Sequence, residues 1–400
     1  MTPGHERAET EGTVRPDSIE LAEEARSWRS AYVHIPFCAR RCPYCDFAVV
    51  ADGERGSGET DRYVEAIVAE ISLEQAPFRL DAVNFGGGTP SRLAPGGFER
   101  ILEALDGRFG IADGAEVSIE ANPEDWAPGY AQELIAVGFN RVSFGIQSFD
   151  PDVLTSLGRN HSPEQAERAM RAARDAGFAS LNIDLIYGDP AETDASWSTT
   201  VGRALDLEPD HLSAYALTVE GGTDLSRAVR DGAPAPDPDV QADRYDHVAD
   251  RARGAGLVRY EVSNWGRPGH ACRYNLSSWM MGEFLGFGTG SHDHRRGTRA
   301  RNIRRLDAYL ERVEIGVRPR AGSEHLDPFE KERERFMVGL RLAGGVRPGA
   351  IGTAFLQNPD GRRLIDAGVI RRAGDRVIVA RPLLTDLVAR SVLSVSPGEC

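Results

Sequence analysis

The sequence lacks any apolar run of the about 18 to 20 residues that a membrane-spanning helix needs. Its N-terminus also lacks the apolar core of a secretory signal peptide. Cysteine is scarce, with five in 400 residues, and the odd number fits a reducing compartment in which thiols stay free for metals. These absences predict a cytoplasmic protein without a transmembrane segment.

Basic residues are outnumbered, since 47 Lys and Arg stand against 61 Asp and Glu for a net charge of -14. Because nucleic acids are bound by basic faces, this balance argues against a nucleic-acid partner. One basic cluster lies between Arg295 and Arg305, and it is interpreted as a solvated loop and helix face. The 41% hydrophobic and 27% charged residues are typical of a soluble protein with a sizeable core.

Three of the five cysteines, Cys38, Cys42 and Cys45, lie within eight residues. The other two, Cys272 and Cys400, are far away along the chain. A C-x3-C-x2-C loop after a short apolar strand suits a [4Fe-4S] cluster held by three thiolates. One iron of such a cluster remains free for a small ligand, so this spacing predicts a reactive metal centre.

Three other interpretations of the cysteine loop remain open. A zinc site would need four ligands, with His34 as the fourth, and no second ligand pair follows at finger or ribbon spacing. A thioredoxin-like motif at Cys42 and Cys45 would have no use for Cys38. Chance clustering of buried cysteines is the third, and a loop that carries proline and arginine disfavours it.

From Ala31 onward, strand-like apolar runs alternate with amphipathic helical windows, which is typical of βα units and a parallel sheet. The predicted strands are 32–35, 81–85, 116–119, 141–146, 180–186 and 211–217. The predicted helices are 60–75, one that carries Phe98 to Leu105, 130–137, 163–176 and 194–207. The fourth helix has a capping box at Ser162 and Gln165 and ends at Gly177. Six βα units are therefore expected by residue 217.

The strands alternate between an apolar and a polar face. The apolar set is Val117, Ile119, Val142, Phe144, Ile146, Leu181, Ile183 and Leu185. Their alternates are mostly polar: Ser118, Glu120, Ser143, Gly145, Gln147, Asn182, Asp184 and Ile186. Parallel strands that are buried on both faces read as continuous apolar runs. The polar face therefore predicts an interior lined for a ligand.

The rest of the chain is predicted less regularly. Residues 220–240 are expected to form a boundary loop, 241–254 a helix and 257–262 a strand, whereas 270–294 mixes aromatic, glycine and polar residues without a clear period. The run from Gly286 to Gly290 has the wrong spacing for a dinucleotide fingerprint. Helices at 329–342, 360–368 and 382–393, with a hairpin at 369–380, suggest a winged-helix-like module. The predicted parts are a flexible polar arm at 1–30, a barrel at 31–220, its extension at 221–320 and the module at 321–400.

Four motifs give the chain a family resemblance: His34-Ile35-Pro36-Phe37-Cys38, Asn84-Phe85-Gly86-Gly87-Gly88-Thr89-Pro90-Ser91, Arg141-Val142-Ser143-Phe144-Gly145-Ile146-Gln147-Ser148-Phe149 and Asn182-Ile183-Asp184-Leu185-Ile186-Tyr187-Gly188. With the cysteine loop, they resemble radical S-adenosylmethionine (SAM) proteins. Within these they resemble the oxygen-independent coproporphyrinogen III oxidase family and its HemW-type haem chaperones. The resemblance covers about residues 31 to 390. It implies an α/β fold, a partial (β/α)6 TIM-like barrel followed by an α+β, winged-helix-like C-terminal module.

The resemblance also implies which residues bind the cofactors. Cys38, Cys42 and Cys45 would hold the cluster, and the methionyl end of SAM would chelate its fourth iron. The implied SAM-binding residues are Tyr32, Tyr44, Gly87, Gly88, Thr89, Glu120, Gln147, Arg159 and Asp184. Taken alone, Arg159 could also be an ordinary surface arginine and Asp184 a structural cap.

One position separates the two branches of this family. The oxidases carry a fourth cysteine two residues after the third, and here that residue is Phe47. The chain also has only about thirty polar residues before the first strand, where the oxidases have a longer arm. The resemblance therefore favours a haem chaperone, with haem, a haem-acceptor protein and an electron donor as partners. The alternatives are a coproporphyrinogen III oxidase and a divergent radical SAM enzyme with another substrate.

The haem ligand is the least regular part of the resemblance. HemW-type proteins typically show a His-Asn-x-x-Tyr-Trp motif, and the matching stretch here runs from Tyr274 to Trp279, so that both the His and the Tyr differ. Tyrosinate, imidazole and thiolate can all ligate haem iron. The candidate haem region is His270, Cys272, Tyr274, Asn275 and Trp279, with His292 and His294 further on. Asn275 and Trp279 could instead pack the barrel edge.

Overall fold

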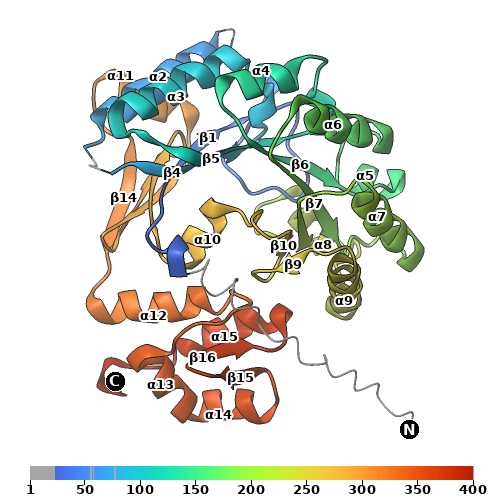
Figure 1. The fold of residues 1–400 in the computed structure, drawn as a ribbon, viewed down its shortest axis with the longest axis vertical. Helices are drawn as coiled ribbons and strands as arrows, with labels where there is room; N and C mark the ends of the chain where they lie inside the picture. Colours follow the sequence, from blue (N-terminus) through green and yellow to red (C-terminus); the bar gives the residue numbers. More distant parts are fainter. Residues whose placement is uncertain (1–22, 55, 57, 76–77, 400) are drawn as a thin grey trace.

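A twisted 12-stranded sheet forms the centre of the protein in the computed structural model, which describes residues 23–54, 56, 58–75 and 78–399 (Figure 1). Six neighbouring strands are parallel and follow one another in chain order: β1 (Arg29–Ile35), β4 (Leu80–Gly87), β5 (Ile111–Ala121), β6 (Arg141–Gln147), β7 (Ser180–Tyr187) and β8 (His211–Ala216). All six predicted strands are confirmed. The open barrel that they form is the predicted (β/α)6 core.

Helices cover the outer face of these strands (Figure 1). They are α2 (Glu59–Leu73), α3 (Pro95–Phe109), α4 (Tyr130–Val137), α5 (Pro151–Ser156), α6 (Pro163–Ala176) and α7 (Asp194–Asp206). The predicted capping box is present, because the Ser162 hydroxyl accepts from the Gln165 N–H and the Gln165 side chain accepts from the Ser162 N–H. Among the helices of the described residues, none is long and apolar enough to cross a membrane.

The apolar face of the strands packs against these helices to form the main core. Phe85, Phe98 and Phe139 meet edge to face, with ring centroids 5.1 to 5.3 Å apart. Ile119, Phe144 and Leu185 of the predicted apolar set are completely buried there. Since burial of this face removes apolar surface from water, it leaves the polar alternates on the inner side of the barrel.

Both ends of the barrel sheet are extended by later parts of the chain. β11 (Glu283–Phe287) pairs in parallel with β1 and continues into the antiparallel strands β12 (His292–Arg295), β13 (Thr298–Asn302) and β14 (Arg320–His325). At the other end, β10 (Asn264–Gly266) and β9 (Val258–Arg259) follow β8. Residues 270–294, which have no clear period in the sequence, contain α10 (Arg273–Trp279), β11 and the start of β12. Residues 220–240 are not all loop, because α8 (Asp224–Arg230) lies among them.

A buried carboxylate attaches this extension to the barrel. Glu70 of α2 accepts hydrogen bonds from the Gly288 N–H (2.8 Å), the Asn302 amide (2.6 Å) and the Tyr309 hydroxyl (2.7 Å). Tyr309 lies on α11 (Leu306–Glu314), which packs beside α2. The glycine-rich run at the end of β11 is therefore a turn that binds Glu70, in keeping with its poor match to a dinucleotide fingerprint.

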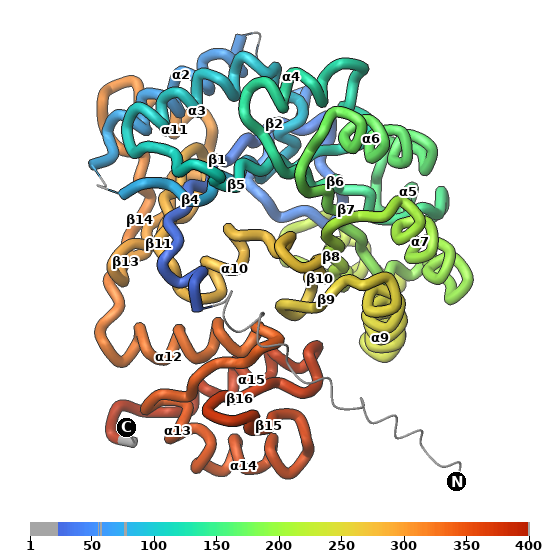
Figure 2. The backbone as a smooth tube through the Cα atoms, viewed as in Figure 1, coloured from blue at the N-terminus to red at the C-terminus, as the bar shows by residue number. Residues whose placement is uncertain are grey.

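The C-terminal residues form a second apolar core of their own. This module contains α12 (Pro328–Gly339), α13 (Gly349–Gln357), α14 (Pro359–Asp366), the hairpin β15 (Ile370–Ala373) and β16 (Arg376–Val379), and α15 (Thr385–Val392). Figure 2 shows it below the barrel, and through Leu342 and Arg341 it contacts Glu261 and also Trp279 of α10. The predicted helices and hairpin are present, and α13 is an additional helix.

The predicted flexible arm at 1–30 lies mostly outside the described residues. Of its last residues, Ala25 is buried, and Glu23 pairs with Arg376 and Arg347 of the C-terminal module. β1 begins at Arg29, three residues before the predicted strand. The chain just before the barrel thus contacts the module at the far end of the sequence.

Candidate functional site

The inner side of the barrel is a cavity of about 550 Å³. Every member of the predicted polar face lines it: Ser118, Glu120, Ser143, Gly145, Gln147, Asn182, Asp184 and Ile186. Of the predicted apolar set, only Ile119 reaches it. The three clustered cysteines also line the cavity, at the C-terminal ends of the strands, where barrel folds place their reactive groups.

The cysteine loop is held in shape by short backbone contacts. β2 (Phe37–Cys38) pairs with β3 (Val50–Ala51), and the Cys45 N–H donates to the Cys42 carbonyl at 3.1 Å. The Thr89 hydroxyl donates to the Cys38 sulfur at 3.6 Å. All three cysteines are free thiols, and burial raises the pKa of Cys38 to about 11. A bound metal would therefore have to displace the thiol protons.

His34 is not placed as a fourth metal ligand. Its Nε2 bonds to the Ala48 carbonyl at 2.8 Å, and its Nδ1 bonds to the Tyr32 hydroxyl at 3.2 Å. Burial lowers the pKa of His34 to about 4, so the ring is neutral. Within the described residues, no three His, Cys, Asp or Glu side chains converge as ligands of one ion would. This donor set fits a cluster held by three thiolates better than a closed zinc site.

The glycine turn at the end of β4 is packed against other parts of the protein. A Cβ on Gly86 would lie 2.6 Å from the Glu120 carboxylate, and one on Gly87 would lie 2.3 Å from the His34 ring. A Cβ on Gly88 would lie 2.6 Å from the Pro36 backbone. Gly87 also has a φ of +111°, which only glycine adopts readily. Glycine is thus required by protein packing, while Gly87, Gly88 and Thr89 line the cavity.

Two carboxylates lie on the cavity wall, and burial raises the pKa of both. The pKa of Glu120 rises to about 7, mainly through burial and then through the nearby charge of Asp184. Glu120 accepts a hydrogen bond from the Gly87 N–H at 3.3 Å. The pKa of Asp184 is raised by burial, although Ser143 (2.6 Å) and Asn182 (2.8 Å) donate to its carboxylate. A cationic ligand between them would relieve this cost.

Gln147 and Arg159 lie beside a β-bulge at the end of β6. The register with β7 shifts between Gly145 and Gln147, and Gln147 has a φ of +68°, which is strained for a residue with a side chain. Arg159 donates to the Gly145 carbonyl at 2.7 Å, to the Asn122 side chain, and to the Cys42 sulfur at 3.8 Å. It is therefore not an ordinary surface arginine, since it connects β6 to the cysteine loop.

Other lining residues were not assigned from the sequence. The Asn122 side chain accepts a hydrogen bond from Arg159 and donates one to Thr89. Its position directly after a strand could have identified it as a cavity residue from the sequence. Tyr215 of β8 also lines the cavity. The sequence of the predicted strand did not indicate on which face of the sheet Tyr215 lies. Arg141 also lines the cavity, although it lies at the start of β6, far from the cysteine loop.

The candidate haem residues divide into two groups. Cys272, Tyr274 and Asn275 line the cavity, and the Tyr274 ring stacks on Tyr32 with centroids 5.8 Å apart. His270 and Trp279 are not among the lining residues. Trp279 packs under Arg341 of the C-terminal module at 4.6 Å.

The remaining candidates are two histidines outside the cavity and two aromatic residues of the cysteine loop that line it. His292 and His294 are on β12 and do not line the cavity. The Nδ1 of His294 bonds to the Gly282 carbonyl at 3.1 Å. Tyr44 and Phe47 line the cavity from the cysteine loop, and Phe47 is 58% exposed.

Comparison with known proteins identifies the family. The sequence profile of the radical SAM superfamily matches residues 32–204. The chain is 40% identical over 370 residues to the protein named heme chaperone HemW of Mycobacterium tuberculosis, covering 90% of this chain and 94% of that one. The chain belongs to the HemW family of radical SAM proteins. Another HemW family member, from Synechocystis, is 38% identical over 79% of each chain.

A more distant relative and a solved structure agree with this. The mouse mitochondrial radical S-adenosyl methionine domain-containing protein 1 is 36% identical over 81% of this chain and 75% of its own. The structure of coproporphyrinogen III oxidase (HemN) from Escherichia coli matches with a TM-score of 0.78 at 23% identity, over 94% of this chain and 92% of that one. This second likeness concerns the fold. Membership of the superfamily implies a [4Fe-4S] cluster and SAM as cofactors of this HemW family member.

Proposed function

We propose that this protein is a haem chaperone, which binds haem and delivers it to acceptor proteins in the cytoplasm. The observation that carries the proposal is the 40% identity to the heme chaperone HemW of Mycobacterium tuberculosis over nearly the whole of both chains. The polar cavity beside three free cysteines supports it, because a cluster and SAM need such donors. An electron donor and a haem-acceptor protein are the expected partners.

The cofactors are assigned to the cavity through its own chemistry. Cys38, Cys42 and Cys45 would hold the cluster, which when bound supplies an electron to the SAM sulfonium. Glu120 would bind the SAM ammonium, since a cation there offsets the cost of ionising a buried carboxylate. Asp184 is suited to the ribose hydroxyls because its carboxylate already accepts from hydroxyl and amide donors.

The remaining assigned residues surround these groups. Gln147 and Arg159 would supply polar contacts from the bulge at the end of β6. Gly87, Gly88 and Thr89 would bring the β4 turn close to the amino-acid end of SAM. Tyr44 would flank the adenine side and Tyr32 the haem side. All of these residues line the cavity.

Among the candidate haem ligands, Tyr274 fits the cavity best. Cys272 is a buried thiol that donates to Glu116 at 3.5 Å, and burial raises its pKa to about 12, which disfavours the thiolate. Tyr274 faces the cavity and stacks on Tyr32. Burial raises the pKa of Tyr274 too, but a ferric iron can stabilise tyrosinate by coordination.

The test is a haem titration of the anaerobically reconstituted protein, followed through the Soret band. We expect saturable binding of about one haem, unchanged in Cys38→Ala, which should lose the cluster absorbance. Tyr274→Phe should alter the Soret maximum and weaken binding, whereas Tyr215→Phe, a second tyrosine of the cavity, should not. Absence of any saturable Soret change would refute the chaperone and leave a radical SAM enzyme of another substrate.

A second arm separates the chaperone from the oxidase. The reconstituted protein is incubated with coproporphyrinogen III, SAM and a reductant, and the products are separated by chromatography. We expect no protoporphyrinogen, because Phe47 stands where the oxidases have their fourth cysteine. Formation of protoporphyrinogen at many turnovers would establish the oxidase instead.

A further inference from the structure

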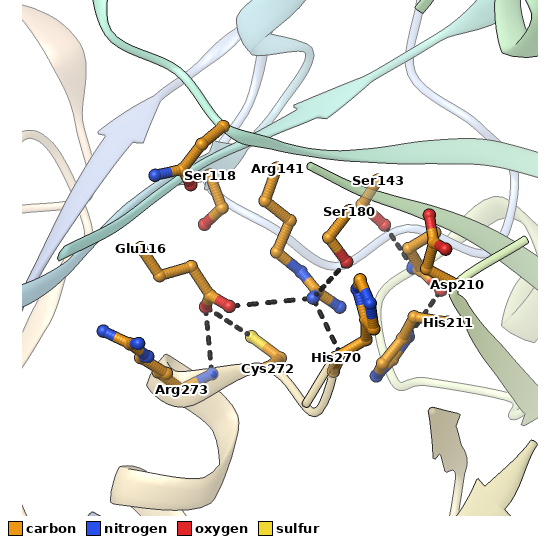
Figure 3. Close-up of polar contacts among 12 residues, drawn as sticks. Glu116, Ser118, Arg141, Ser143, Ser180, Asp210, His211, His270, Cys272 and Arg273 are labelled. Atoms are coloured by element: carbon orange, nitrogen blue, oxygen red, sulfur yellow. Dashed lines mark hydrogen bonds and ion pairs between the residues drawn. The ribbon is translucent and has the colours of Figure 1, made fainter. Parts of the chain in front are cut away.

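The floor of the cavity contains a buried arginine that the proposed function does not use (Figure 3). Arg141 is only 4% exposed, and it lines the cavity from the start of β6. Its Nη1 donates to the Ser180 hydroxyl and to the His270 carbonyl, both at 2.9 Å. A buried guanidinium carries five N–H donors, so these bonds leave three of them unaccounted for.

Glu116 is the carboxylate beside Arg141, but it is bonded mainly to other groups (Figure 3). Its Oε1 accepts from the Arg273 N–H at 2.9 Å and from the Cys272 thiol at 3.5 Å. Its Oε2 lies 3.6 Å from the Arg141 Nη1, which is an ion-pair distance and not a hydrogen bond. Within the described residues, the Nε and Nη2 of Arg141 meet no acceptor at hydrogen-bond distance.

The other groups of the floor do not supply that acceptor. His211 is neutral, because burial and the charge of Arg141 lower its pKa well below the usual value. Its nitrogens bond to the Asn182 side chain at 2.6 Å and to the Tyr260 hydroxyl at 2.8 Å. Asp184 accepts hydrogen bonds from the Asn182 amide and the Ser143 hydroxyl. The floor therefore offers one cation with free donors, and the two carboxylates whose charges act on it, Glu116 and Asp184, are hydrogen-bonded to other groups.

We propose that Arg141 anchors a carboxylate group of the bound ligand at the cavity floor. This proposal rests on the proposed function, since haem carries two propionates and one of them would meet the free edge of the Arg141 guanidinium. Arg–carboxylate pairs are favoured when two parallel N–H donors face the acid, and the Nε and Nη2 of Arg141 form such an edge. The propionate would share Arg141 with Glu116, while the porphyrin extends toward Tyr274.

The experiment compares ferric haem with its dimethyl ester, in which both propionates are blocked. Each is added from dimethyl sulfoxide to the full-length protein, and binding is followed through the Soret band. Arg141→Lys keeps a charge beside Glu116 but loses the forked edge. Arg244→Lys is the matched control, because Arg244 is also a buried arginine and pairs with Glu192 and Asp194, both at 2.7 Å, outside the cavity.

We expect the wild type and Arg244→Lys to bind the acid at least about tenfold more tightly than the ester, as one charge-assisted hydrogen bond can provide. In Arg141→Lys this ratio should fall to near one, and a merely structural role of Arg141 would weaken acid and ester equally. Equal binding of both forms by the wild type would overturn the anchor and leave the chaperone standing. An unchanged ratio in Arg141→Lys would also overturn it, and binding of neither form would overturn both proposals.

Discussion

Among single residues, Gly87 combines a positive φ with a closely packed neighbour. Its backbone has a φ of +111°, and the place where a Cβ would stand is filled by the His34 ring. Gly138 has nearly the same φ, +110°, but nothing lies within 4 Å of its Cβ position. Comparing alanine substitutions at the two glycines therefore distinguishes the cost of backbone strain from the cost of a steric clash.

We expect Gly138→Ala to lower the free energy of unfolding by about 1 kcal/mol, the cost of backbone strain alone. Gly87→Ala should cost about 2 kcal/mol more, because the His34 ring must also move. Urea denaturation of both variants measures the difference. Equal losses would show that the His34 contact is loose.

The buried carboxylate of Glu120 gives a pH dependence with a definite sign. Its pKa is raised from 4.5 to about 7, mainly by burial, so between these values the folded protein holds a proton that the unfolded chain has released. Its stabilising contribution is therefore complete below pH 4.5 and is lost as the pH rises to 7. In cofactor-free protein, Glu120→Gln should be the more stable form at pH 7.5, by between about 1 and 3 kcal/mol.

Glu124 lines the same cavity, and its pKa is shifted in the opposite direction. Burial alone would raise its pKa, but the His161 ring, whose Nδ1 lies 3.3 Å from the Glu124 carboxylate, and the charge of Arg159 outweigh burial and lower it. Glu124→Gln should therefore be less stable than the wild type at neutral pH, and the deficit should shrink as the pH falls. Urea denaturation of both variants and the wild type from pH 4.5 to 7.5 measures how the free energy of unfolding changes with pH and tests both predictions. Parallel pH profiles for Glu120→Gln and the wild type would contradict the shift.

At the scale of elements, β6 combines a regular strand with a strained end. Gln147 has a left-handed backbone at the bulge and also lines the cavity. Glu208 has a similar φ of +50°, is exposed and does not line the cavity. Backbone strain at a ligand-binding site is often retained because the strained residue has a function. Backbone strain in an exposed turn needs no such explanation.

We expect both Gln147→Gly and Glu208→Gly to raise the free energy of unfolding by about 1 kcal/mol, because glycine adopts positive φ without strain. Only Gln147→Gly should also weaken SAM binding by the reconstituted protein, measured by calorimetric titration. If both variants bind SAM like the wild type, Gln147 has no part in the SAM site.

The elements also show which features could be read from the sequence. The barrel strands and the lining alternates Ser118, Glu120 and Asp184 were predictable because the period of two is local. The strands β10 to β14 were missed because they are short and paired by distant segments. Arg141 and Glu116 could not be placed together, since their meeting depends on strand register and on a loop about 130 residues later.

At the scale of the whole molecule, the barrel and the C-terminal module meet at a small interface, called the seam here, formed by Glu261, Trp279, Arg341 and Leu342. Glu261 is completely buried and bridges to Leu342 through the backbone. The Arg341 Nε lies 3.5 Å from the Glu261 carboxylate, and its guanidinium covers the Trp279 ring. One arginine of the module therefore contacts both the barrel end and the helix that carries Tyr274.

Arg341→Ala should lower the free energy of unfolding by roughly 2 kcal/mol, because a buried carboxylate loses its cation, discounted for the partial exposure of the arginine. Calorimetry should then show the module melting before the barrel. Arg333→Ala is the control, since Arg333 stacks on Phe329 within the module at 5.3 Å. A single transition lowered equally in both variants would contradict a special role for the seam.

The pairing of β1 with β11 has a consequence for synthesis on the ribosome. β1 and the cysteine loop emerge early, but β11, which covers the other edge of β1, is made about 240 residues later. At translation rates of about 5 to 20 residues per second this interval is on the order of 10 to 50 s. During this interval the sheet around the three cysteines is incomplete. A cluster that is inserted before chain release would therefore bind to a cavity that still lacks β11 and the residues after it.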